Sequence, residues 1–196
     1  GCAPLPTEAL RELRGCSRLE LVSFRGCTRL TDQAVGFLMP MQALQLLCLD
    51  ETRCGDVALL MACAVGAPLS RLHVARCAGV TDKGLQVLGK RSGVTELNLS
   101  GCEHVGDEGV SCLAQLCRLT RLDLGGAPLV SQRALTALQA ALPGCHLGPC
   151  GLGMRPPPHA ALFRTRGASG GASAGMSSGG ASGGASPSLA GRVNGG

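Results

Sequence analysis

The chain has 196 residues and a formal net charge of +5, from 18 lysines and arginines against 13 acidic residues. All the acidic residues lie in residues 1–150, whereas residues 151–196 contain four arginines and no acidic residue, so residues 1–150 are nearly neutral. This balance argues against a nucleic-acid groove, and the absence of tryptophan and tyrosine removes side chains that commonly stack on bases. The sequence contains no run of about 18 apolar residues, the length that would predict a membrane span.

A repeat of 25 residues organises most of the chain. Three apolar positions recur in the first part of each unit, beginning at Leu19, Val22 and Phe24. A position in the second part is occupied in successive units by Val35, Leu60, Leu85, Val110 and Leu135. A period of this length is typical of a solenoid, in which each unit stacks on its neighbours to complete a core.

Residues 1–18 match the second half of one unit. Gly1-Cys2 aligns with Gly26-Cys27, and Leu5, Leu10 and Leu13 have the spacing of a helix. We therefore expect a partial repeat here, and we expect the sequence to be part of a longer protein.

Five full units are predicted over about residues 19–143, each made of a short strand, a turn and a helix. Segments of the form L-x-x-L-x-L alternate inward and outward side chains, as a strand does, and occur at 19–24, 44–49, 69–74, 94–99 and 119–124. Val110 and Leu113 stand three apart, which favours a helix. We expect Asp32, Asp82 and Asp107 to accept hydrogen bonds from the free amides at a helix start.

Residues 144–150 are predicted to form a degenerate cap with one last strand. Cys145, His146 and Cys150 offer three possible ligands for a metal, but tetrahedral zinc usually takes four ligands from paired motifs, so we predict no metal site. Residues 151–196 are rich in glycine, alanine and serine, and we expect a disordered low-complexity tail.

The unit L-x-x-L-x-L-x-x-C-x-x-[LV]-[TG]-D-x-x-[LV]-x-x-L resembles the cysteine-containing leucine-rich repeat of the F-box/leucine-rich-repeat proteins. The resemblance covers the repeat region, about residues 1–150, and no F-box is present in this chain. It implies an α/β solenoid shaped like a horseshoe arc, with a parallel sheet on the concave side and helices on the convex side. One structural position of the repeat is occupied by Cys2, Cys27, Thr52, Cys77 and Cys102.

Outward strand positions are predicted to line up in columns on the concave face, because equivalent residues of stacked units lie over one another. The resulting rows mix charge signs, which fits either internal ion pairs or a surface that reads a partner protein. The partner-binding residues we select are Arg25, Asp50, Arg71, His73, Glu96, Asn98, Arg121 and Asp123.

These features predict a non-catalytic binding module with no cofactor. By resemblance, it would be the substrate-recognition part of an SCF (Skp1–cullin–F-box) ubiquitin ligase, acting in proteasomal degradation, with Skp1 and cullin contacted only through a missing F-box. The alternative is a leucine-rich-repeat scaffold or adaptor outside ubiquitin chemistry. Cysteines at repeat positions favour a reduced, cytoplasmic or nuclear protein, and we expect a monomer that binds neither nucleic acid nor membrane.

Overall fold

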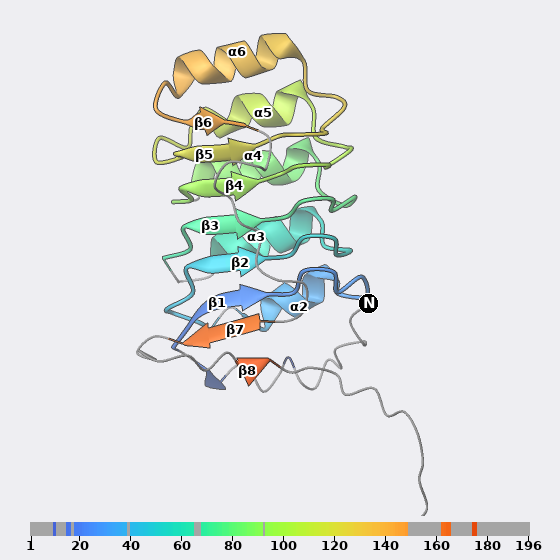
Figure 1. Ribbon diagram of the computed structural model, residues 1–196, viewed down its shortest axis with the longest axis vertical. Coiled ribbons are helices and arrows are strands. Elements are labelled where there is room, and N and C mark those ends of the chain that lie inside the picture. Colours follow the sequence, from blue (N-terminus) through green and yellow to red (C-terminus); the bar gives the residue numbers. More distant parts are fainter. Residues whose placement is uncertain are drawn as a thin grey trace, which may run out of the picture.

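The structure is a computed structural model that describes residues 10, 15–16, 18–38, 40–64, 68–91, 93–148, 162–165 and 174–175. Within these residues the chain alternates strands and helices in regular order (Figure 1). Cys2, Cys150 and most of the predicted partial repeat and tail lie outside the described residues.

Six strands form a parallel sheet in which each strand pairs with its counterpart one unit later. Their bounds are β1 Leu19–Ser23, β2 Leu46–Cys48, β3 Arg71–His73, β4 Glu96–Asn98, β5 Arg121–Asp123 and β6 His146–Leu147. The pairing from β1 to β5 joins residues that differ by 25, for example Leu47 with Leu72. β6 pairs with β5 as the predicted last strand.

Five helices lie on one side of this sheet, as Figure 1 shows. They are α2 Asp32–Gly36, α3 Asp56–Ala64, α4 Asp82–Arg91, α5 Asp107–Leu113 and α6 Gln132–Ala141. The arrangement of one strand and one helix per unit confirms the predicted leucine-rich-repeat solenoid. The sheet face turned away from the helices is called the concave face below.

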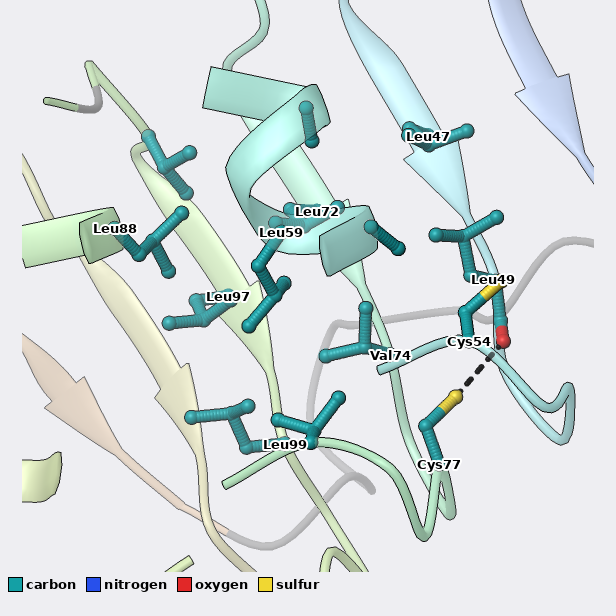
Figure 2. Packing of buried hydrophobic residues seen from close by; sticks show 14 of the residues in the cluster. Leu47, Leu49, Cys54, Leu59, Leu72, Val74, Cys77, Leu88, Leu97 and Leu99 are labelled. Atoms are coloured by element: carbon teal, nitrogen blue, oxygen red, sulfur yellow. Dashed lines mark hydrogen bonds between the residues drawn. The ribbon is translucent and has the colours of Figure 1, made fainter. Parts of the chain in front are cut away.

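The core is a ladder of equivalent apolar side chains between sheet and helices (Figure 2). Leu47, Leu72 and Leu97 are fully buried one unit apart, and Leu122 is 1% exposed. Each full burial of such a side chain is worth roughly 1.5–3 kcal/mol, so the stacking of units provides the stability that one unit lacks.

The second unit departs from the predicted phase. Leu60 shares the apolar repeat position of Leu85 and Val110, which are fully buried, but it is 46% exposed, and the preceding Leu59 is fully buried in its place. The reason is the shorter turn before α3, which begins at Asp56, one position early in the repeat. The inward position follows the helix start by three residues, as Val110 follows Asp107.

Aspartates at the helix starts connect successive units rather than serving only their own helix. Asp32 Oδ1 accepts hydrogen bonds from the backbone nitrogens of Gly55 at 2.6 Å and Ala58 at 3.2 Å. Asp56 accepts from Thr81, and Asp82 Oδ1 accepts from the Gly106 nitrogen at 2.7 Å. The helix start that each aspartate satisfies is therefore that of the following unit.

The position shared by the cysteines faces the strand-to-turn junction of the preceding unit. Cys77 Sγ donates to the Leu49 carbonyl at 3.0 Å, drawn in Figure 2, and Cys102 Sγ donates to the Val74 carbonyl at 3.2 Å. Thr52 donates its hydroxyl to the Leu49 carbonyl at 2.6 Å within its own turn. A small buried donor at this position therefore satisfies a buried carbonyl.

Strand β7, Leu162–Thr165, lies inside the segment that we predicted to be disordered. It pairs antiparallel with β1, and β8, Ala174–Gly175, pairs antiparallel with β7. The described sheet therefore has the order β6-β5-β4-β3-β2-β1-β7-β8. β7 satisfies backbone groups on the edge of β1 that would otherwise be open to pairing with another chain.

Candidate functional site: the concave face

The first column of the concave face is defined by Leu21, Leu46, Arg71, Glu96 and Arg121, which lie in register on β1 to β5. Leu46 is buried, at 6% exposure, whereas the side chains of Glu96 and Arg121 are 24% and 46% exposed. Arg121 and Glu96 form an ion pair at 3.7 Å. The column thus grades from an apolar end to an accessible, charged end.

The second column consists of Ser23, Cys48, His73, Asn98 and Asp123, and all five are at most 2% exposed. Asn98 Oδ1 accepts hydrogen bonds from the Ser100 nitrogen at 3.0 Å and hydroxyl at 2.8 Å. Asp123 Oδ1 accepts from the Gly125 nitrogen at 2.8 Å. Asn98 and Asp123 therefore shape the turns that follow their own strands.

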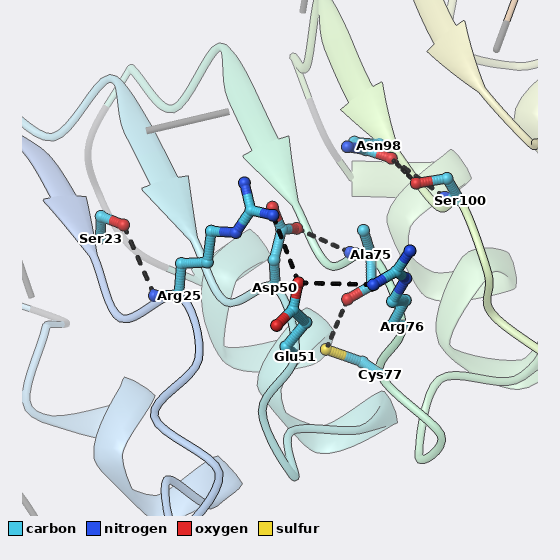
Figure 3. A network of polar contacts seen from close by, with 9 residues as sticks. All are labelled: Ser23, Arg25, Asp50, Glu51, Ala75, Arg76, Cys77, Asn98 and Ser100. Atoms are coloured by element: carbon cyan, nitrogen blue, oxygen red, sulfur yellow. Dashed lines mark hydrogen bonds and ion pairs between the residues drawn. The ribbon is translucent and has the colours of Figure 1, made fainter. Parts of the chain in front are cut away.

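The turns after the strands hold a polar network that differs from the pairing suggested by the columns (Figure 3). Asp50 Oδ1 accepts from the Ala75 nitrogen at 2.7 Å. Arg25, which aligns with Asp50 in the repeat, instead forms an ion pair with Glu51 at 3.3 Å, and Arg76 lies 3.7 Å from the same carboxylate oxygen. Glu51 was therefore missed as a member of this network.

The turn geometry explains the position of Glu51. Glu51 and Arg76 have φ values of +58° and +55°, and their equivalents in other units, Gly26, Gly101 and Gly126, are also left-handed. Glycine adopts this conformation without strain, whereas Glu51 and Arg76 adopt it at a cost in free energy. The repeated glycine was the signal that could have identified this turn position in the sequence.

Burial governs the electrostatics of the second column. It lowers the pKa of His73, although the nearby Asp50 and Glu96 carboxylates act in the opposite direction. Burial, reinforced by the charge of Asp50, raises the pKa of the Cys48 thiol to about 12. Both groups are therefore neutral at pH 7 in the absence of a bound cation.

Three of these side chains form a compact group of donor types that bind metals. Potential ligand atoms of Cys48, Asp50 and His73 all lie within 4.8 Å of one another, and all three residues are buried. The group differs from the Cys145-His146 segment considered as a metal site from the sequence, where His146 is exposed and Cys150 lies outside the described residues. The 25-residue offset between Cys48 and His73 was the available signal for the group.

Comparison with known proteins agrees with the fold. A family model described as "Leucine Rich repeat" matches residues 94–114. The solved structure of leiomodin-1 actin-binding site 2 has a TM-score of 0.53 and 17% identity, and the match covers 71% of this chain and 90% of that one. No curated protein sequence matches this chain.

A leucine-rich-repeat protein of Leptospira interrogans is also similar, with a TM-score of 0.40 and 18% identity, and the match covers 58% of this chain. The chain spans 27% of the length of that protein. The fold of this chain is a leucine-rich-repeat solenoid, an architecture in which stacked units form an extended surface. No helix in the described part of the chain combines the length and apolar character needed to cross a membrane.

Proposed function

We propose that this chain is a protein-recognition module and that the first column of its concave face contacts the partner. The observation that carries the proposal is the register of β1 to β5, which brings Arg71, Glu96 and Arg121 into one row. A row of fixed spacing suits an extended or folded protein segment that offers charges of matching order.

Among the selected partner-binding residues, those of the first column are the most accessible. His73, Asn98 and Asp123 are each 2% exposed, and Arg25 and Asp50 are engaged within the chain. The exposed pair of Arg121 with Glu96 is worth about 0–1 kcal/mol, so a partner can replace it at small cost. Arg71 and Arg121 would then meet acidic groups of the partner.

We further propose that the bound partner is a substrate of an SCF ubiquitin ligase. Support comes from the repeat itself, which carries cysteine at the position of Cys27, Cys77 and Cys102 and an aspartate at the helix start, as in the F-box/leucine-rich-repeat proteins. In that family the repeats hold the substrate while an F-box contacts Skp1. The chain described here would accordingly bind substrate without binding Skp1 or cullin.

The binding surface is tested by charge reversal. The full chain with Arg71→Glu and Arg121→Glu should lose affinity for its partners by about tenfold or more, because each reversal replaces attraction with repulsion. A matched control, Lys83→Glu with Arg133→Glu, changes the same total charge at exposed positions on α4 and α6. Equal binding by the concave and control variants would contradict the proposed surface.

The ubiquitin assignment needs a separate measurement. Proteins captured by the wild-type chain and lost with the concave variant should accumulate in cells when the gene is silenced or the proteasome is inhibited. Captured proteins whose lifetimes do not change under either treatment would favour a scaffold outside ubiquitin chemistry. Recovery of Skp1 and cullin on residues 1–150 alone would contradict the division between substrate binding and adaptor binding.

A further inference from the structure

The group formed by Cys48, Asp50 and His73 arises from the register of two neighbouring strands. Cys48 ends β2, His73 ends β3, and the two residues are paired directly across the sheet. Asp50 follows Cys48 by two residues, so its side chain returns to the same face as the strand turns away. The possible ligand atoms of the three residues lie within 4.8 Å of one another.

His73 has no hydrogen-bond partner in this setting. The residue is 2% exposed, and neither Nδ1 nor Nε2 forms a hydrogen bond with any described residue. Buried polar atoms are normally satisfied, and an imidazole with two unsatisfied nitrogens lowers stability. Asn98 and Asp123, the equivalent residues of the next two units, each use a side-chain oxygen in a local turn. The equivalent nitrogen after His73, that of Ala75, donates to Asp50 Oδ1 instead, and the His73 ring lies close to the possible ligand atoms of Cys48 and Asp50.

We propose that Cys48, Asp50 and His73 together bind one zinc ion. A thiolate, a carboxylate and a neutral imidazole are all zinc ligands, and the mixture of sulfur, oxygen and nitrogen favours zinc over calcium or magnesium. On binding, the Cys48 thiol proton passes to solvent as the zinc–sulfur bond forms. One thiolate and one carboxylate then balance the two charges of the ion, which suits a buried position.

Zinc binding requires only a small shortening of the distances between the possible ligand atoms of these three residues. Zinc–ligand bonds of about 2.0–2.3 Å place tetrahedral ligand atoms about 3.3–3.8 Å apart, and rotation of the three side chains can close the remaining gap. The hydrogen bond from the Ala75 nitrogen to Asp50 Oδ1 at 2.7 Å already orients the carboxylate. Three protein ligands leave a fourth position for water or for a donor atom of another molecule.

The test uses the full chain, freed of metal by a chelator and kept reduced, titrated first with cobalt(II) alone and then with zinc. We expect one equivalent of cobalt to give a thiolate-to-metal charge-transfer band together with visible bands of four-coordinate cobalt, and zinc to displace it. Cys48→Ser should abolish the charge-transfer band. His73→Gln and Asp50→Asn should weaken binding by more than about tenfold.

The matched control is Cys117→Ser, which removes an exposed cysteine outside the group and should leave the titration unchanged. A band that survives Cys48→Ser, or is lost with Cys117→Ser, would overturn the proposal. Since substitutions at buried positions can disturb folding, a second measurement uses the wild-type chain alone. X-ray absorption of the zinc complex should show one sulfur at about 2.3 Å with nitrogen or oxygen ligands, and two or more sulfurs would reject the site.

Discussion

Gly84 lies directly against the carboxylate of Asp56 in the preceding unit, and a β-carbon at Gly84 would overlap Asp56 Oδ1. The same overlap links Gly109 with Asp82, one unit later. The aspartates cannot move aside freely, because Asp56 also accepts hydrogen bonds from the nitrogen and hydroxyl of Thr81 at 2.8 and 2.7 Å. The aspartate at the start of one helix and the glycine near the start of the next helix therefore pack together and link two successive units.

Gly109→Ala should destabilise the chain by about 1–3 kcal/mol, although alanine is the better helix former by about 1 kcal/mol. The added methyl group would meet the Asp82 side chain and, at 3.0 Å, its α-carbon. Chemical denaturation measures the difference. Gly36→Ala in α2 is the control, because its nearest neighbour, Met61 Sδ, is at an ordinary 3.7 Å. Equal effects of the two substitutions would show that the aspartate does not restrict the glycine.

Asp107 should make stability depend on acid. The Ser131 backbone nitrogen and then its hydroxyl, each 2.7 Å away, hold the pKa of Asp107 below its usual value. Because the pKa of Asp107 is lower in the folded chain than in the unfolded chain, its ionised carboxylate stabilises the fold. This stabilisation is fully present above the unfolded pKa of about 3.9 and is lost as the pH falls through the folded pKa. Between pH 6 and pH 2 the melting temperature should fall less steeply for Asp107→Asn than for the wild-type chain. Glu108→Gln, one residue away on the exposed surface, should retain the wild-type slope.

Adjacent leucines on α3 test the phase of the second unit. Leu59→Ala should cost about 2–5 kcal/mol, since Leu59 is fully buried and its loss leaves a cavity. Leu60→Ala should change the free energy of unfolding by at most about 0.5 kcal/mol, because Leu60 is 46% exposed. Reversed values in urea denaturation would restore the phase expected from the strict 25-residue period.

Cysteine reactivity should separate buried from exposed thiols. Burial raises the pKa values of Cys48, Cys54 and Cys102 to about 12, so only about one molecule in ten thousand carries the thiolate at pH 8. Cys16 and Cys117 are exposed. Brief alkylation of the native chain followed by peptide mass spectrometry should modify Cys16 and Cys117 first. Early modification of Cys102 would indicate that its hydrogen bond to the Val74 carbonyl opens readily.

The period of the sequence was sufficient to predict the solenoid, because it fixes which residues stack. Val94, Leu97 and Leu99 are buried as predicted, and Leu122 lies over Leu97 in the next strand. The prediction failed where a unit changes length. Leu60 was assigned by counting residues, whereas the helix start at Asp56 decides which side chain points inward.

The binding face was harder to predict because a column gives neighbours but not rotamers. The sequence placed Arg25 beside Asp50, yet the left-handed backbone at Glu51 turns that carboxylate toward Arg25 instead. Likewise, alternation marks His73 as outward without showing that it is 2% exposed. Exposure depends on how neighbouring side chains fill the sheet face, which no single unit encodes.

The contact between the aspartate of one unit and the glycine of the next makes neighbouring units interchangeable. Removal of residues 82–106 in frame would bring Gly109 to the place of Gly84, next to Asp56, and Asp107 to the place of Asp82. Leu122 would then stand 25 residues after Leu72, in the place of Leu97, so the register of the strands would be kept. Lengthening or shortening of the stack by whole units is thereby open to evolution and to engineering, while insertion of a partial unit would break the aspartate links on both sides of the change.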